Sequence, residues 1–427
     1  MRGCLKKYSS GLKIIIALTL FSVTGVSGLF SDGYQFPGIG ARELARGGAV
    51  TADVSNWTSI YWNPAGLSEI RGKWNGGFHL LYAMTDMVDD NSVPNSFSAI
   101  DPTLPAAYDK TSNEENSFLG SVGAAYRINN RYSVAVGLYA PLLNGVEFSD
   151  SLRGPASQSS VRLDNKVTLL YPSVSFAAKI NDRLSVGAGI STIIADMELD
   201  VKETYTSPLL PVRMISHSDL DASGFGVEGN IGLQFKIHPK LLFGMMYRTG
   251  SYITMKGSGT QKLTNPLTFT DTIIESDFTS DFVVPPTLAM GLCLVPEDRL
   301  RISFDIQRTF WNNFDNHIDF NNPLVADIPN TADWKDANRY RLGINWLAPK
   351  EIDVNAGLFY YEHAVDAPDL LLVIDADQLM WTAGLGRDFK RVRVDASVVQ
   401  GGGGDTLDGN YRYIKGLQFN LGLELNY

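Results

Sequence analysis

The sequence predicts an all-β fold: a transmembrane antiparallel β-barrel of about fourteen strands, with an N-terminal hatch that plugs the lumen. Three observations predict it. A secretory signal is followed by no spanning helix, apolar residues alternate singly with polar ones, and short polar turns recur along the chain. Because backbone polar groups in lipid need internal partners, a chain without a spanning helix crosses a membrane only as a closed barrel.

Residues 1–28 are expected to be a signal peptide that is absent from the mature protein. Basic residues precede an apolar run at 14–23, and the small residues of 26–28 follow it. This run is about half as long as the roughly 20 residues that a spanning helix needs. No later segment reaches about 18 uninterrupted apolar residues. We therefore expect the mature chain to enter the outer membrane through strands.

The acidic balance of the chain limits its partners. A net charge of -10 argues against nucleic acid, because phosphates attract lysine and arginine. Cys4 leaves with the signal, and Cys293 alone forms neither a disulfide framework nor a cysteine metal cluster. The five histidines show no metal-ligand spacing. We expect no metal, no cofactor and no catalytic residues.

The last strand shows the alternation most clearly. Its apolar set is Leu417, Phe419, Leu421, Leu423, Leu425 and Tyr427. A period of two is typical of a strand with one apolar and one polar face. The terminal aromatic resembles the signal that the outer-membrane assembly machinery reads. A half-buried strand of a soluble sandwich is the other interpretation.

Six short polar turns each join two alternating segments. They lie at 128–131, 180–183, 237–240, 295–299, 348–351 and 386–390. The stretches between them are long enough for two strands of about 10 residues and one long loop. Six turns join twelve strands, and one strand near 74–84 plus the terminal strand complete fourteen. Residues 73–427 are thus expected to form the barrel.

The alternation also assigns faces to the strands. In the strand after residue 299, apolar side chains such as Phe304 are expected to face lipid, where a basic residue at mid-depth costs about 2 to 4 kcal/mol. The arginines predicted to face the lumen are Arg301, Arg341, Arg391 and Arg393. They either bind a carboxylate head group, whose shape arginine matches with paired hydrogen bonds, or form cross-strand ion pairs within the wall.

Residues 29–72 precede the first strand and do not alternate. Glycines surround a short helix-prone piece at 41–46, and a second piece ends at Asn63-Pro64-Ala65, where proline breaks what precedes it. A fourteen-stranded barrel is wider than the roughly eight-stranded one that side chains alone fill. We therefore expect 29–72 to form a hatch inside the barrel.

Four ordered segments carry a resemblance to a known family. The hatch holds Gly-Ile-Gly-Ala-Arg at 38–42 and Tyr-Trp-Asn-Pro-Ala-Gly-Leu at 61–67. Farther on, Asp-Phe-Val-Val-Pro-Pro occupies 281–286 with Gly-Leu at 291–292, and the segments at 304–311 and 334–343 match in kind and order. Together they resemble the FadL-type outer-membrane transporters of long-chain fatty acids and other hydrophobic compounds. The resemblance spans almost the whole mature chain.

This resemblance implies passive transport of a hydrophobic small molecule, either a long-chain fatty acid or an aromatic hydrocarbon. It implies lateral release near a kinked third strand into outer-membrane lipid, beneath the lipopolysaccharide that apolar molecules cross poorly. The candidates for this exit are Leu138, Tyr139, Pro141 and Gly145. Proline cannot donate to the ladder, but the family usually has Pro-Phe-Gly here. Pro141 therefore either opens the ladder or only ends the strand.

Other functions remain open on the sequence alone. A general porin needs no hatch, so the segment 29–72 argues against it. A FadL-like surface barrel that shuttles secreted proteins, or an adhesin-type surface protein, would share the hatch and depend on a protein partner. A lipid hydrolase needs a Ser and a His paired at the outer rim, and nothing in the sequence ties such a pair together. We expect a monomer that is not an enzyme.

Overall fold

The structure is a computed structural model. It describes residues 37–89, 95–99, 101–108, 111–207, 213–264, 270–313, 317–325, 327, 333–365, 375–407 and 410–427. The expected signal peptide, residues 1–28, lies outside the described residues, as does the start of the expected hatch at 29–36.

The described chain is mostly strand, with a few short helices. The helices are α2 (Ala41–Ala45), α3 (Ser59–Trp62) and the 3-10 helices η1 (Pro64–Glu69), η2 (Ser96–Ala99) and η3 (Trp311–Asn313). None of them is long and apolar enough to cross a membrane. The strands are β1 (Trp74–Asp89), β2 (Thr111–Arg127), β3 (Tyr132–Arg153), β4 (Gln158–Lys179), β5 (Leu184–Thr206), β6 (Met214–His238), β7 (Leu241–Arg248), β8 (Ser251–Thr264), β9 (Asp271–Val284), β10 (Thr287–Glu297), β11 (Leu300–Thr309), β12 (Ile318–Phe320), β13 (Ala337–Ala348), β14 (Ile352–Tyr361), β15 (Gln378–Phe389), β16 (Val392–Leu407) and β17 (Asn410–Asn426).

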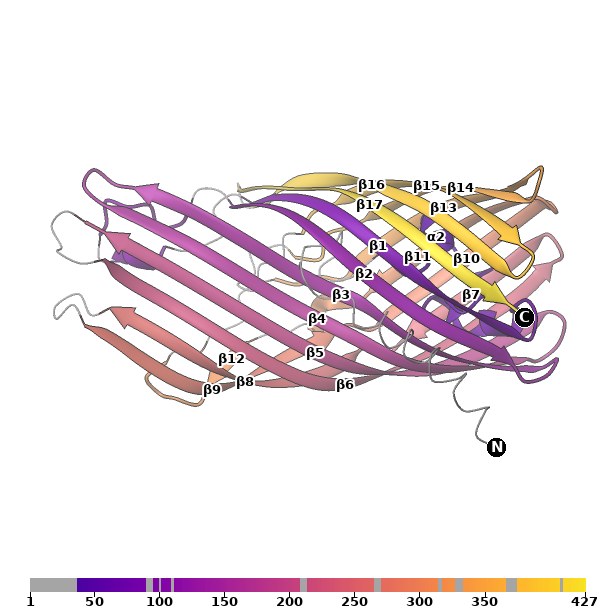
Figure 1. The fold of residues 1–427 in the computed structure, drawn as a ribbon, viewed down its shortest axis with the longest axis horizontal. Helices are drawn as coiled ribbons and strands as arrows, with labels where there is room; N and C mark the ends of the chain where they lie inside the picture. The colour runs from indigo at the N-terminus through magenta and orange to yellow at the C-terminus, as the bar shows by residue number, and fades with distance from the viewer. Residues whose placement is uncertain are drawn as a thin grey trace, which may run out of the picture.

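These strands form one closed antiparallel sheet (Figure 1). Closure comes from β1, which pairs with β17 from Asn75↔Asn426 to Asp89↔Arg412 and with β2 on its other edge. Because the sheet closes on itself it has no free edge strand, which is the physical condition for crossing a membrane with strands.

Three wall strands are interrupted, so the seventeen pieces make fourteen strands. β7 and β8 both pair with β6 and are separated by Gly250, whose φ of 65° favours glycine. β9 and β10 are separated by two prolines, which cannot donate to a ladder. β12 continues the line of β11 and pairs with β9. The predicted count of about fourteen strands is confirmed.

All six predicted turns join consecutive strands at one end of the barrel, here called the turn end. Local hydrogen bonds explain two of them. Asn129 Oδ1 accepts from the backbone N–H groups of Arg131 at 2.8 Å and Tyr132 at 3.0 Å. Asn181 makes the same pair of contacts in the next turn. Asparagine favours turns because its side chain can replace a backbone acceptor in this way.

The predicted face assignments are confirmed for the strands β11 and β13. The lipid-facing Phe304 and Leu342 are 47% and 42% exposed in the isolated chain, whereas Asp305 and Arg341 are 0% and 3% exposed. The wall is also uneven in height: β3 to β6 have 22 to 25 residues, and β14 and β15 only 10 and 12 (Figure 1). About 10 residues cross the membrane, so the long strands extend well beyond it at the loop end, opposite the turns.

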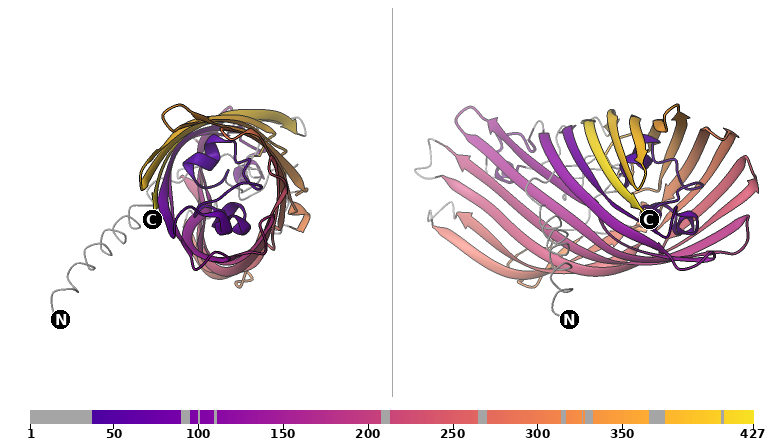
Figure 2. Two further views of the ribbon diagram at one scale, coloured as in Figure 1. Left: turned by 90° about the vertical axis from the view of Figure 1, so that its right-hand side faces the viewer. Right: turned by 45° about the vertical axis from the view of Figure 1, so that its right-hand side comes forward.

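Residues 37–72 lie within the ring of strands, as the left view of Figure 2 shows for the indigo segments. α2 packs on β14 to β17, and η1 packs on β3 to β6, so the segment crosses the lumen from one side of the wall to the other. It is almost completely buried. We call this described part of the expected hatch the lumen segment.

Candidate functional site: the lumen pocket

The lumen segment approaches the wall most closely where the wall has glycine. A Cβ on Gly187 of β5 would lie 2.4 Å from Pro64, and one on Gly244 of β7 would lie 2.2 Å from the carbonyl oxygen of Thr51. A Cβ on Gly343 of β13 would lie 2.4 Å from the carbonyl oxygen of Arg46. Any side chain at these three positions would therefore displace the segment, since real Cβ atoms do not make contacts this short.

The motif Asn63-Pro64-Ala65 begins η1 and fixes it to the wall. Asn63 Oδ1 accepts from the N–H of Ala65 at 3.1 Å, which is an N-cap contact, and proline occupies the first helical position. The Asn63 amide nitrogen donates to the carbonyl oxygens of Thr51 at 2.8 Å and Leu233 of β6 at 3.0 Å. One side chain thus joins the helix start, the preceding loop and the barrel.

A charged network holds the middle of the lumen segment. Arg46 forms an ion pair with Asp53 at 2.9 Å, and Arg301 of β11 contacts the same carboxylate at 3.3 Å. Burial alone would raise the pKa of Asp53, but the charges of Arg46 and Arg301 lower it below its ordinary value. Next to it, Asp305 Oδ2 accepts from the backbone N–H groups of Val50 at 2.9 Å and Thr51 at 2.8 Å. β11 therefore fixes this part of the segment to the wall.

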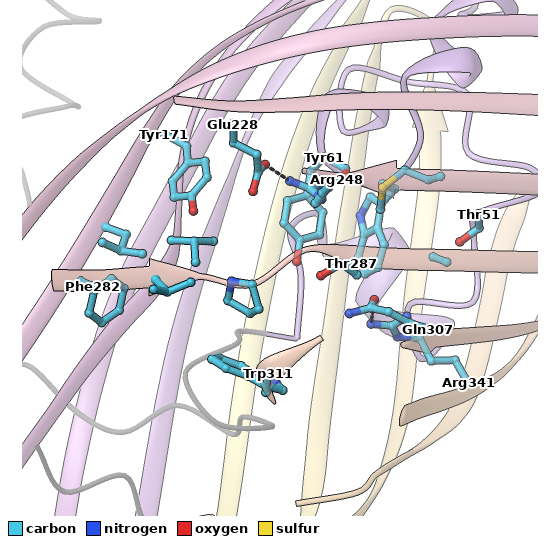
Figure 3. A pocket seen from close by; sticks show the side chains of 17 residues that line it. Thr51, Tyr61, Tyr171, Glu228, Arg248, Phe282, Thr287, Gln307, Trp311 and Arg341 are labelled. Carbon is cyan, nitrogen blue, oxygen red and sulfur yellow. Dashed lines mark hydrogen bonds and ion pairs between the residues drawn. The ribbon is translucent and has the colours of Figure 1, made fainter. Parts of the chain in front are cut away.

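A pocket lies between the lumen segment and the wall, on the side of β4, β6, β7 and β10 (Figure 3). Its lining is mostly aromatic and aliphatic, with a few charged or polar side chains. The lining residues are Thr51, Tyr61, Trp62, Leu169, Tyr171, Glu228, Met246, Arg248, Phe282, Val283, Val284, Pro285, Thr287, Ala289, Gln307, Trp311 and Arg341. Apolar walls with few polar groups are typical of sites for small molecules.

Two arginines reach this pocket, and their partners differ. Arg248 forms an ion pair with Glu228 at 2.9 Å, donates to the carbonyl oxygen of Tyr61 and lies 4.6 Å from the centre of the Tyr61 ring (Figure 3). Arg341 donates to Gln307 Oε1 at 2.9 Å and lies 5.6 Å from the Trp62 ring. Within the part of the chain that the structure describes, Arg341 has no carboxylate within 4 Å.

The third strand bends where the sequence places Pro141. The ladder between β3 and β4 shifts register between Tyr139 and Leu142, which marks a bulge. On the other edge, β2 and β3 pair only from Arg127↔Ser133 to Val122↔Leu138. Over the described residues of both strands, no pair continues beyond Leu138, although β2 and β3 each extend farther toward the loop end.

Comparison with known proteins decides the identity of this architecture. The profile described as "Outer membrane protein transport protein (OMPP1/FadL/TodX)" matches residues 27–400. The chain belongs to this family. The family consists of outer-membrane transport channels and not of enzymes, so the chain is an outer-membrane transport barrel and the lipid hydrolase interpretation is excluded.

Solved structures show the same fold at low identity. A Pseudomonas aeruginosa FadL homologue has a TM-score of 0.69 at 15% identity, and the match covers 92% of this chain and 99% of that one. The P. putida toluene transporter TodX gives 0.69 at 16% identity, and the Ralstonia pickettii toluene transporter TbuX gives 0.65 at 16%, both with the same coverage. A search of curated sequences gave no match.

The structure separates the four arginines that the sequence offers as head-group candidates. Arg393 contacts Asp353, Asp388 and Asp395 at 2.6 to 3.1 Å, and Arg301 contacts Asp53. Both are engaged in structural ion pairs. Arg391 is not in the lumen wall: it is exposed in the turn before β16, with its guanidinium 4.8 Å from the Tyr427 ring. Because β16 begins at Val392, the alternation does not extend to Arg391. Arg341 alone of the four lines the pocket.

The exit candidates lie at the interruption of the ladder. Leu138 is the last residue of β3 paired with β2, Tyr139 follows it as a fully buried lumen residue, and Pro141 falls within the register shift. Gly145 pairs with Lys166 of β4. Pro141 therefore does not end the strand, which continues to Arg153. Sequence reasoning missed Arg248 and Glu228, because nothing in one strand's alternation says which lumen residue borders empty space.

Proposed function

We propose that this protein carries amphipathic acids, molecules with an apolar body and one carboxylate, passively from outside the cell into the outer membrane. Among solved members of its fold are toluene transporters and a FadL homologue, and transport of hydrophobic compounds is the activity of the family. The apolar lining of the lumen pocket supports an apolar cargo. The observation that carries the choice of an acid is Arg341.

Arg341 is a buried cation whose direct contacts are neutral. It is 3% exposed, makes a cation–π contact with the Trp62 ring and donates to the amide oxygen of Gln307. A buried charge without a counter-charge is costly, and a guanidinium matches a carboxylate with two parallel hydrogen bonds. A cargo carboxylate at the pocket would supply that counter-charge. Asp305 lies opposite Arg341 in the ladder and attracts it from more than 4 Å, but its Oδ2 accepts from the lumen segment.

Binding of two probes tests this choice of cargo. We expect Arg341→Met to weaken dodecanoate binding to the purified barrel by about 10- to 100-fold, the worth of one charged hydrogen-bonded contact of roughly 1.5 to 3 kcal/mol. Toluene binding should change little. Arg341→Lys keeps the charge without the paired geometry and should lie between. The matched control is Arg308→Met, which removes an exposed arginine of β11 that contacts Asp336. If Arg341→Met weakened the binding of dodecanoate and of toluene equally, Arg341 would not be the residue that binds the carboxylate.

For the route, we propose lateral release between β2 and β3, beyond Leu138. The early end of this ladder and the bulge at Pro141 support such an exit, because apolar cargo is better delivered to hydrocarbon than to water. Cysteines at Gly120 and Ala140, cross-linked across the two strands, should abolish dodecanoate uptake while the barrel stays folded. A cross-link at Val136 and Val174, across the continuous ladder of β3 and β4, is the control. Normal uptake with the first cross-link would mean another exit.

A further inference from the structure

Three tyrosines form one aromatic cluster between the lumen pocket and the interrupted ladder. The ring of Tyr139 meets the ring of Tyr61 edge to face at 5.5 Å and stacks on the ring of Tyr171 at 5.5 Å. Tyr61 and Tyr171 line the pocket, as Figure 3 shows, whereas Tyr139 does not. Tyr139 is 0% exposed, and its hydroxyl also interacts with Arg248, which lines the pocket.

The pairing of β3 with both neighbouring strands changes at Tyr139. Leu138 is the last residue of β3 that pairs with β2, and the register with β4 shifts immediately after Tyr139. The neighbouring strand residue Gly137 would bring a Cβ within 3.4 Å of Ile60 in the lumen segment. The ring of Tyr139 thus occupies the space between the pocket and the first unpaired stretch of the wall.

We propose that Tyr139 is a gating residue: its ring closes the path from the pocket to the gap between β2 and β3, and it opens when Tyr61 moves away. This inference rests on the proposed lateral route. It concerns a residue that binds no head group and that only obstructs or clears the path of an apolar body.

The lumen segment controls this gate through Tyr61. One face of the Tyr61 ring is covered by the guanidinium of Arg248, which also donates to the Tyr61 carbonyl oxygen and is held by Glu228. These contacts keep Tyr61 against Tyr139. A shift of the segment away from β7 would remove Tyr61 from one side of the Tyr139 ring. Tyr139 would keep its contacts with Tyr171, with Arg248 and with the Ser191 hydroxyl at 3.3 Å, and its ring could move into the space that Tyr61 leaves.

Opposite changes in size at residue 139 test the gate. In cells with intact lipopolysaccharide, Tyr139→Ala should raise the initial rates of both dodecanoate and toluene uptake several-fold. Tyr139→Trp should lower both rates to those of cells that lack the protein. Tyr139→Phe keeps the ring but loses the hydroxyl's contacts with Ser191 and Arg248, so its rates should lie between those of the unchanged protein and those of Tyr139→Ala. Heat-modifiable electrophoretic mobility shows that each barrel is folded, and Tyr139→Leu replaces the alanine variant if that one fails to fold.

A general loosening of the lumen is the alternative, and Phe359→Ala controls for it. Phe359 is a buried ring of β14 that packs with Leu44 and does not line the pocket. An equal rise in uptake from Phe359→Ala, or changes of the same sign from alanine and tryptophan at 139, would overturn the gate. If the unchanged protein speeds neither probe, the proposed function fails. If it speeds them and residue 139 has no effect, only the gate fails.

Discussion

Glu43 of α2 should make the seating of the lumen segment depend on pH. Its side chain is 4% exposed, and the amide nitrogen of Asn56 joins Glu43 at 3.0 Å to Glu424 of β17 at 3.1 Å. Burial raises the pKa of Glu43 from 4.5 to about 7, Arg42 opposes the rise, and Glu424 and Asp395 add to it. The carboxyl therefore holds a proton more firmly in the seated segment than in a displaced one.

This difference in pKa sets the direction and the size of the pH effect on seating of the lumen segment. The stabilising contribution is fully present below pH 4.5, the ordinary pKa, and is lost as pH rises through about 7. A difference of two to three pKa units corresponds to about 3 kcal/mol in the free energy of seating. The equilibrium between the seated and the displaced segment then changes roughly a hundredfold. Glu43→Gln mimics the protonated form and keeps an oxygen that accepts from Asn56. In this variant, the seating of the lumen segment should not weaken through residue 43 as pH rises.

Amide hydrogen exchange of the purified barrel measures this effect. The reporters are the amides of Val50 and Thr51, which are bonded to Asp305 in the seated segment. After correction for intrinsic exchange, their protection should fall between pH 5 and pH 8 in the unchanged protein and fall less in Glu43→Gln. Asp305 is common to both proteins, so the difference between them isolates Glu43. Parallel pH profiles in the two proteins would refute the reasoning.

Three further results are expected. Asp305→Ala leaves two buried N–H donors without an acceptor and should destabilise seating by roughly 2 to 6 kcal/mol, seen as faster exchange at Val50 with the barrel still folded. Gly244→Leu should displace the segment at Thr51 and raise ion conductance in planar bilayers, whereas Gly120→Leu, in more open space, should not. Deleting residues 29–62 should leave a folded barrel, because the strands bond to each other, with higher conductance than the full protein; unchanged conductance and uptake would contradict a plug.

The sequence determined the barrel because its signal is local. A strand that separates lipid from lumen must alternate with a period of two, and a short turn must carry residues such as Asn129 that bond to their own backbone. Both requirements act over a few residues and can be read from one chain. The strand count, the six turns and the lipid-facing set followed from them. Family resemblance added the expected hatch motif at Asn63-Pro64-Ala65.

Only the tertiary structure decided what each lumen residue does. Alternation places Arg301, Arg341 and Arg393 on the same face, yet their roles depend on neighbours that come from other strands or from the lumen segment. Arg393 meets carboxylates of β14, β15 and β16, whereas Arg341 meets a neutral amide and a pocket. Such contacts depend on register across the closed sheet and on the path of the segment through it. Ion pairs and hydrogen bonds need atoms that lie within about 3 to 4 Å of each other, so a pattern along one chain cannot reveal which strands supply the partners.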